Sequence, residues 1–240
     1  RPPRSTLFPY TTLFRSKDLG SSLILAAICF ICFMSTPRDY YKKYKKLVWI
    51  ALAVAVIILG FLITAVLQGY QLQRIDSWLK PLKIENIYDS SWQLVNSLIA
   101  FTDGGIFGLG LGNSIQKYDY IPEAHNDFIG AIIYEELGIF GLALMIIPTA
   151  IIIFRLLKYA DQIQNNKSRV ILIGIASYFM LHLFVNLGGV SGLIPMTGVP
   201  LLLVSSGGSS TIAALIAIGI AQAIISKFNK EQLEKTDTQL

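Results

Sequence analysis

Residues Leu47–Leu67, LVWIALAVAVIILGFLITAVL, decide the fold class of this chain. The stretch is 21 residues long and contains no charged side chain. A helix needs about 20 apolar residues to cross a bilayer, so this stretch predicts a transmembrane helix. Four more apolar stretches are long enough, or nearly so, to do the same: Leu19–Met34, Phe128–Phe154, Val170–Leu187 and Thr211–Ile225. We therefore predict an all-α polytopic membrane protein with about five transmembrane helices.

The composition of the chain also favours a membrane protein. Hydrophobic residues make up 53% of the chain and charged residues 15%, and the mean hydropathy is +0.57. These values differ from those of ordinary soluble domains. The formal net charge of +5 does not indicate nucleic-acid binding, because the basic residues form short clusters beside the apolar stretches. No group of residues has metal-ligand spacing, so the sequence predicts no metal site.

Loop charges orient the predicted helices. The loops Pro37–Lys46 and Arg155–Arg169 are basic, and the tail adds Lys227, Lys230 and Lys235. Five alternating spans put these three segments on one side, which the positive-inside rule makes cytoplasmic. The long segment 68–126 then faces outward, and residues 228–240 form a cytoplasmic tail.

The first 16 residues stand apart from this organisation. Thr6–Ser16, TLFPYTTLFRS, resembles the translation of a sequencing-adapter oligonucleotide. We therefore expect residues 1–16 to be non-native, the membrane domain to cover residues 17–227, and an upstream part of the reading frame to be missing. The stretch has no apolar core and no small-residue cleavage site, so it does not predict a signal peptide.

The outward segment contains an amphipathic pattern and a glycine-rich run. Ile75, Trp78, Leu79 and Leu82 recur at helical spacing, which fits either a helix in the membrane interface or one packed on the protein's own surface. The run GGIFGLGLGNS, residues 104–114, lacks the Gly-Lys-Ser/Thr ending of a phosphate-binding loop. We expect its glycines to let the backbone pack against neighbouring helices. The alternative is that its N–H groups contact a pyrophosphate.

The heptapeptide PEAHNDF, residues 122–128, places three ionisable groups at the outer mouth of a predicted helix. Asp127, or Asn126 beside it, fits the N-cap of a helix that starts at Phe128, and composition alone favours that interpretation. Asp127 also fits a catalytic base. His125 fits a base, a proton relay or an interface residue.

Two acids interrupt the long apolar stretch that follows. Glu135 and Glu136 are costly inside a membrane, so they indicate a function, a water-filled cavity or a buried partner. We predict that residues 128–137 form a separate re-entrant half-helix that ends at Gly138, followed by a true span over Ile139–Phe154. The sequence SSGGSS, at 205–210, fits a cavity-lining entry or a cap at the start of the last helix.

Five motifs together resemble the second half of the SEDS family, the FtsW/RodA/SpoVE-like proteins. They are RIDSWLKP at 74–81, GIFGLGLGNSIQK at 105–117, PEAHNDFIGAIIYEELGIFG at 122–141, NLGGVSGLIPMTGVP at 186–200 and SSGGSS at 205–210. The PEAH-x-DF…EELG block is the most specific, and the similarity covers nearly everything from Lys17 to Lys227. The resemblance implies a ten-helix fold, of which this chain would hold the last five helices.

The resemblance also implies a function, a glycosyltransferase that polymerises lipid II into peptidoglycan at the outer face of the bacterial cytoplasmic membrane. It would act in cell division, elongation or sporulation, among membrane lipids and with a class B penicillin-binding protein as its transpeptidase partner. Asp127 stands where the family has an aspartate thought to act in polymerisation, so we expect it to be catalytic. We expect substrate contacts from Glu123, His125, Lys117, Arg74, Ser209 and Ser210. No cofactor is evident, and a divalent cation bridging the pyrophosphate and an acid stays an open alternative.

Some positions depart from the family pattern. Asn126 stands where Thr or Ser is usual, His182 where Gln is expected in the division branch, Leu202 where Pro is expected and Ser206 where Tyr is expected. Two other functions stay open beside the enzyme: a flippase for lipid-linked precursors, whose essential acids would be Glu135 and Glu136 at greater membrane depth, and a non-catalytic division scaffold. If half of the protein is missing, we expect this chain alone to be inactive.

Overall fold

The computed structural model describes residues 19–36, 44, 46, 48, 76, 78–82, 91–118, 120–121 and 124–237. Within these residues the secondary structure is helical, without a strand. The helices are α2 (Leu19–Ser35), α6 (Trp92–Gly104), α7 (Ile129–Leu137), α8 (Ile139–Gln162), α9 (Asn166–Val190) and α10 (Gly208–Asp237). Helices α8, α9 and α10 are long and apolar enough to cross a membrane, and α2 is a shorter apolar helix. The expected span Leu47–Leu67 lies outside the described residues.

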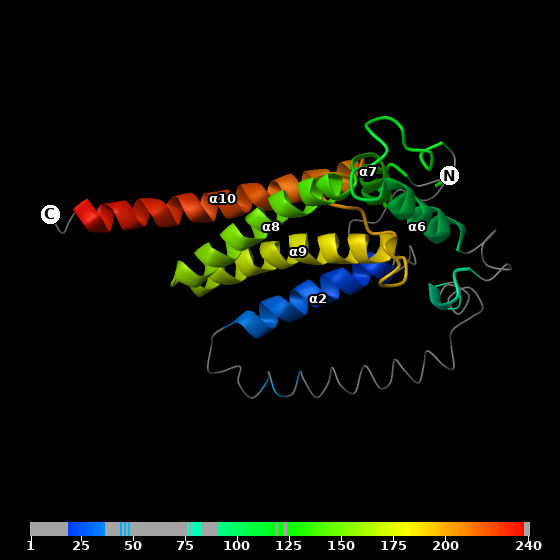
Figure 1. Ribbon diagram of the computed structural model, residues 1–240. Helices are drawn as coiled ribbons and strands as arrows, with labels where there is room; N and C mark the ends of the chain where they lie inside the picture. The colour runs from blue at the N-terminus through cyan, green and yellow to red at the C-terminus, as the bar shows by residue number, and fades with distance from the viewer. Residues whose placement is uncertain are drawn as a thin grey trace, which may run out of the picture.

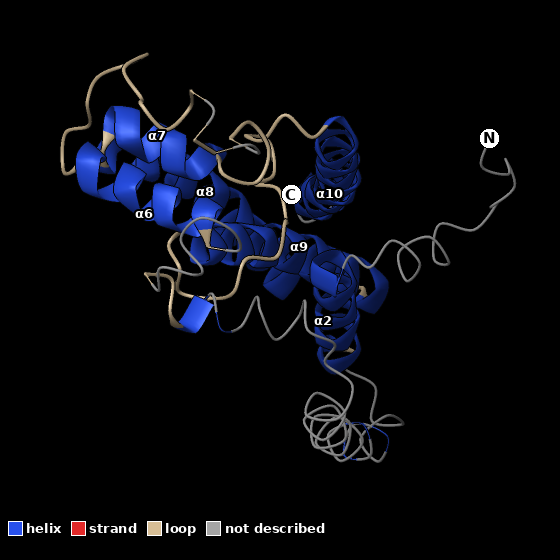
Figure 2. Cartoon of the chain, turned by 90° about the vertical axis from the view of Figure 1, so that its right-hand side faces the viewer, coloured by secondary structure: helices blue, strands red, loops and turns tan. Residues whose placement is uncertain are grey.

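The long helices run side by side, and the short ones gather at one end (Figure 1). Helix α9 packs against α8, α2 and α10, while α6 packs against α7. Figure 2, seen from the end that carries α6 and α7, places α9 between α2 and α10. The loop between α8 and α9 and the C-terminal end of α10 lie at the opposite end (Figure 1). The two described segments that carry the Lys and Arg residues used for orientation therefore share one end of the molecule, as the charge pattern predicts.

The predicted helix break at Gly138 is confirmed. Helix α7 ends at Leu137, and α8 begins at Ile139. Gly138 has φ +61° and ψ −140°, a backbone conformation that side chains with a Cβ rarely adopt. Its N–H donates to the carbonyl of Tyr134, and the N–H of Ile139 donates to the carbonyl of Ile106 in the glycine-rich run. A stretch longer than one crossing needs is thus divided into a short helix and a span.

Several helix ends differ from the predicted bounds. Helix α8 continues to Gln162 instead of ending at Phe154, and α10 continues to Asp237, through much of the segment predicted as a tail. The sequence pattern marks only the apolar part of each helix, whereas helical hydrogen bonding continues into the charged part. The N-cap of α7 is Phe128 rather than Asp127 or Asn126, and its side chain makes no capping bond.

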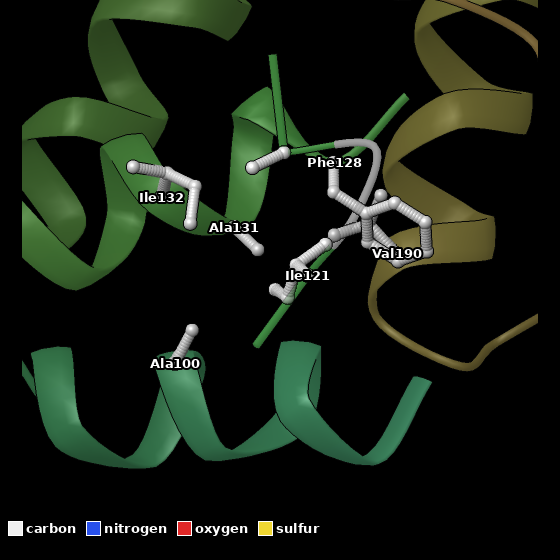
Figure 3. Packing of buried hydrophobic residues seen from close by; sticks show 7 residues of the cluster. Ala100, Ile121, Phe128, Ala131, Ile132 and Val190 are labelled. Carbon is white, nitrogen blue, oxygen red and sulfur yellow. The ribbon is translucent and has the colours of Figure 1, made fainter. Parts of the chain in front are cut away.

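Small side chains let the helices approach one another. Ala160 of α8, Ala176 of α9 and Ala221 of α10 belong to one buried cluster, together with Leu156, Ile163 and Leu172. Close approach at small residues is the usual way in which membrane helices associate. A second cluster lies at the end that carries α6 and α7, where Ala100 and Ala131 face each other (Figure 3). This second cluster supports the candidate site.

Candidate active site

The turn that precedes α7 is held by the loop that precedes α10. The carbonyl of His125 accepts hydrogen bonds from the backbone N–H of Ser206 at 3.1 Å and from its hydroxyl at 2.9 Å. The carbonyl of Asn126 accepts from the hydroxyl of Ser205 at 2.6 Å. The Ser205 hydroxyl also accepts a bond from the N–H of Leu201, at 2.8 Å, so it is itself fixed. The backbone of residues 125–126 is therefore tied to a segment about 80 residues away.

The backbone of Asp127 is held by helix α9. The side-chain amide of Asn186 donates one hydrogen to the carbonyl of Asp127 and the other to the carbonyl of Val199, each at 2.8 Å. Asn186 is 3% exposed, so these bonds are shielded from water. Successive carbonyls at 125, 126 and 127 thus all accept hydrogen bonds from other elements, which leaves the turn little freedom to move.

The carboxylate of Asp127 faces a glycine turn across a small pocket. A Cβ added at Gly198 would lie 3.4 Å from Oδ2 of Asp127, so the two approach closely. Gly198 has φ +71°, in the left-handed region that glycine adopts without strain. Asp127 is partly exposed, so its carboxylate can meet a ligand. The pocket is lined by Asp127, Phe128, Val185, Asn186, Gly189, Val190, Met196, Thr197, Gly198 and Val199.

The residue after Asp127 is an apolar anchor. Phe128 is 2% exposed and belongs to the cluster of Ala100, Ile121, Ala124, Ala131, Ile132 and Val190. Figure 3 shows its ring beside Val190 at the end of α9. That end of α9 is itself tied to α6, because the hydroxyl of Ser97 donates to the carbonyl of Val190 at 2.6 Å. Asp127 is thus fixed by hydrogen bonds on its own backbone and by a buried ring at the next position.

The glycine-rich run packs against α7, as expected for its glycines. The N–H groups of Leu109 and Gly110 donate to the carbonyls of Glu135 and Glu136, both at 2.9 Å. A Cβ on Gly108 would overlap the carbonyl of Glu136, so only glycine fits there. Because these N–H groups serve the protein's own fold, the alternative that they contact a pyrophosphate is wrong for Leu109 and Gly110.

Glu135 joins the segment after the glycine run to α7. Its carboxylate is 0% exposed and accepts hydrogen bonds from the hydroxyl of Ser114 at 2.5 Å and from the N–H of Ile115 at 2.8 Å. The N–H of Gln116 donates as well, at 3.3 Å. A buried carboxylate surrounded by donors is satisfied, so the hydrogen bonds of Glu135 give it a structural role.

Lys117, a predicted substrate contact, lies against the neighbouring acid. Its Nζ is 2.9 Å from Oε1 of Glu136 and also donates to the carbonyl of Gly112. The hydrogen bond with Glu136 raises the pKa of Lys117 above its ordinary value. The lysine is therefore charged at neutral pH and at the same time holds the loop to α7.

The other predicted site residues that the structure describes make separate contacts. His125 is exposed beside Asp127 in sequence, with its carbonyl bound to Ser206. Ser209 and Ser210 lie in the first turn of α10 rather than in a non-helical entry; Ser209 is exposed, and the hydroxyl of Ser210 donates to the carbonyl of Gly207 at 2.8 Å. Glu123 and Arg74 lie outside the described residues.

Three other residues named in the sequence analysis, Trp78, Asn126 and Ser206, also make hydrogen bonds. The indole N–H of Trp78 donates to the carbonyl of Gly192 at 2.8 Å, which favours packing on the protein's own surface over the interfacial alternative. Asn126 and Ser206, which both depart from the family pattern, contact each other: the serine hydroxyl donates to Oδ1 of Asn126 at 3.0 Å. Among the described residues, no group of three or more His, Cys, Asp or Glu could hold a metal ion.

The contacts that three residues make with the turn of Asp127 were not predicted from sequence. Asn186 was assigned no role, and Ser205 and Ser206 were expected only as part of a cavity-lining entry or a helix cap, yet all three hold this turn. Asn186 gave a signal, because it is an amide inside an apolar stretch, where an uncompensated polar group is costly. The serines gave none, since serines near the start of a helix are common.

These features define an α-helical membrane protein that presents a fixed aspartate at the mouth of an interrupted helix. The chain belongs to the FtsW/RodA/SpoVE family, described as cell cycle protein, whose model matches residues 5–231. The match includes residues 5–16, which were expected to be non-native; they lie outside the described residues, and that expectation stays a prediction.

Relatives named for cell-wall synthesis and sporulation resemble the chain. It is 40% identical over 217 residues to the probable peptidoglycan glycosyltransferase FtsW of Bacillus subtilis (strain 168), covering 90% of this chain and 48% of that protein. It is 33% identical over 204 residues to stage V sporulation protein E of the same organism, covering 85% and 53%. The chain thus spans about half the length of the curated relatives it matches.

A solved structure has a similar fold. It is one chain of a peptidoglycan synthase complex, described for the structural coordination of polymerization and crosslinking. The TM-score is 0.63 and the sequence identity 25%, with 87% of this chain and 56% of that chain covered.

Proposed function

We propose that the complete gene product carrying this chain is a peptidoglycan glycosyltransferase that polymerises lipid II at the outer face of the bacterial cytoplasmic membrane. The observation that carries the proposal is the position of Asp127, partly exposed on a turn whose backbone is held at successive carbonyls. The names of the relatives support the same activity. A base works best when its position is fixed before the substrate arrives.

The proposed step is a displacement at a sugar carbon. The 4-hydroxyl oxygen of one lipid II molecule forms a bond to the C1 carbon of another, and the bond from C1 to the pyrophosphate oxygen breaks. Asp127 takes the hydroxyl proton, and the undecaprenyl pyrophosphate leaves with the electron pair. The partial exposure of Asp127 supports this role, because the carboxylate must reach a hydroxyl within hydrogen-bond distance.

The leaving pyrophosphate needs positive charge or N–H donors. Lys117 is a candidate that is charged and lies at the same end of the molecule, although part of its charge is balanced by Glu136. Arg74, Glu123, His125, Ser209 and Ser210 stay proposed substrate contacts. A divalent cation that bridges the pyrophosphate and an acid stays an alternative, and no step is drawn through it.

The proposed arrangement in the membrane follows from the charge pattern. Residues 17–227 contribute the last five helices of a ten-helix fold, with a large outward loop at 68–126 and the C-terminus in the cytoplasm. Figure 1 supports this orientation, because the loop after α8 and the end of α10 lie opposite α6 and α7. The basic residues of both segments then face the cytoplasm, as the positive-inside rule requires.

The proposed partner is a class B penicillin-binding protein. The resemblance to one chain of a peptidoglycan synthase complex supports it, since that complex couples polymerization with crosslinking. Polymerisation and transpeptidation act on the same glycan strand, so an association of the two enzymes is chemically reasonable. Copurification of the complete gene product with its cognate transpeptidase checks this proposal.

The experiment that tests the function separates polymerisation from transport. The complete gene product is purified with its transpeptidase in detergent and incubated with lipid II, and glycan chains are resolved on a gel. We expect chains without any membrane present. A flippase would instead make no chains, and would move lipid II across vesicles in a way that depends on Glu135 and Glu136. Because Glu135 is already bound by three donors of its own chain, the structure gives this alternative little support.

A further inference from the structure

We propose that Asn186 is a positioning residue for Asp127, an inference that rests on the proposed function of Asp127 as the base. Asn186 lies on α9, 59 residues further along the chain, and is 3% exposed. Both hydrogens of its side-chain amide are used, one on the carbonyl of Asp127 and one on that of Val199. A single side chain thus joins the two walls of the pocket that contains the base.

The geometry of an amide makes this link directional. The amide group is planar, so its two N–H bonds diverge at a fixed angle and fix the two carbonyls relative to each other. Val199 follows Gly198, the residue that Oδ2 of Asp127 faces. Asn186 therefore sets the separation between the carboxylate of Asp127 and the Gly198 turn.

The other half of the Asn186 amide is the oxygen of its side chain. Its Oδ1 is buried, and no described group donates a hydrogen bond to it. A buried polar atom without a partner is unusual in a folded protein. Asn186 also lines the pocket of Asp127. The amide thus holds the turn with its nitrogen, while its oxygen lies on the side of Gly130 in α7, 3.8 Å from where a Cβ of residue 130 would be.

Ser205 acts beside Asn186, and we call these two residues the clamp of the Asp127 turn. It is 5% exposed and donates to the carbonyl of Asn126, one residue before the base. Asn186 and Ser205 hold adjacent carbonyls from two different elements, α9 and the loop before α10. Loss of either donor frees one peptide of the turn and leaves the other bound, so each substitution should displace Asp127 without releasing the whole turn.

The test compares initial rates of lipid II polymerisation at several lipid II concentrations. The proteins are the complete gene product with its transpeptidase, as wild type and as the variants Asn186→Ala, Ser205→Ala and Asp127→Asn. Asn165→Ala is the matched control, because Asn165 caps the other end of α9 through a bond from the N–H of Lys167 at 3.0 Å. Thermal unfolding in detergent shows which variants are folded.

We expect kcat of Asn186→Ala to fall about tenfold to a hundredfold with KM nearly unchanged, because a base displaced by a fraction of an ångström loses alignment rather than substrate affinity. Ser205→Ala should lose kcat in the same way, and Asn165→Ala should keep it. If Asn186→Ala does not fold, the kcat of Ser205→Ala tests the positioning role in its place.

Two results would overturn the inference. One is a folded Asn186→Ala, or in its place Ser205→Ala, with wild-type kcat. The other is a loss that appears in KM or only in the amount of folded protein. The parallel Asp127→Asn variant separates this failure from failure of the proposed function. If Asp127→Asn is inactive while the clamp variants keep wild-type kcat, only the positioning role is wrong. If Asp127→Asn polymerises normally, the proposed base is wrong.

Discussion

Replacement of Glu135 by alanine should detach the segment after the glycine run from α7. Glu135 is completely buried, and its carboxylate accepts from the hydroxyl of Ser114 and from the N–H groups of Ile115 and Gln116. Alanine removes all of these acceptors at once. Ile115 is 52% exposed, so water can replace the carboxylate there. Ser114 and Gln116, at 1% and 5% exposed, have no such access.

The expected cost follows from those two shielded donors. A buried donor left without a partner costs about 1–3 kcal/mol. Two of them, with partial relaxation of the loop, predict a loss of about 2–4 kcal/mol in unfolding free energy for Glu135→Ala. Glu135→Gln keeps the shape and one acceptor, and its amide nitrogen can donate to the Ser114 hydroxyl. It therefore gives up mainly the charge, and we expect a loss of about 1 kcal/mol.

The assay is unfolding of the purified complete gene product in mixed micelles of rising SDS content, with Glu136→Ala as the matched control. Glu136 carries the same charge at the next position, but its ion pair with Lys117 is partly exposed, with side-chain exposures of 16% and 23%. We expect its replacement to cost about 1 kcal/mol or less. Two results would refute the assignment of Glu135 as the residue that anchors the loop to α7. One is an equal loss of unfolding free energy for Glu135→Ala and Glu136→Ala, and the other is a smaller loss for Glu135→Ala than for Glu135→Gln.

Three further predictions concern the same framework. Gly138→Ala should lower the unfolding free energy by about 1–2 kcal/mol or more, because residue 138 has φ +61° and a Cβ would overlap the carbonyl of Ile106. Gly219→Ala is the control: it lies in α10 with nothing within 4 Å of its added Cβ, so it should be neutral or stabilising in the same assay. The pKa of Lys117 is raised in the folded protein, so its stabilising effect should be fully present below the ordinary lysine pKa of about 10.4 and disappear as pH rises through the folded-state pKa. The difference in Tm between wild type and Lys117→Met should therefore stay constant through neutral pH and shrink only in strong alkali. Asn165→Ala should cost about 1 kcal/mol of stability, measured as a fall in Tm, through loss of the α9 N-cap, and a Tm equal to that of wild type would contradict the cap.

The helix break was predictable because several local signals agree at one place. The apolar stretch from residue 128 to 154 is longer than one crossing needs, it contains two acids, and Gly138 follows them. Each of these signals lies within a few residues of the break. The ends of α8 and α10 were not predictable in the same way, because a hydropathy pattern follows the membrane and not the hydrogen bonds of the helix.

The candidate site was only half visible in the sequence. The charges of residues 122–128 marked the segment, and the family motif indicated Asp127 within it. The residues that hold it were missed, since Asn186 is 59 residues away and Ser205 is 79 residues from its partner Asn126. Uncharged donors at such separations have no periodicity and no fixed spacing. Only the folded chain brings them to the turn, which is why the clamp required the structure.

The rate of glycan formation by Asp127→Asn tests the central claim most directly. The complete gene product is assayed with its transpeptidase and lipid II in detergent, after thermal unfolding has shown that the variant is folded. Asp161→Asn is the control, because Asp161 lies near the end of α8 that faces away from the site and pairs with Arg169 at 4.0 Å. General-base catalysis contributes about 10²–10⁴ in rate, so we predict a fall of at least about a hundredfold for Asp127→Asn and none for Asp161→Asn. A folded Asp127→Asn protein that polymerises lipid II at the wild-type rate would contradict the account.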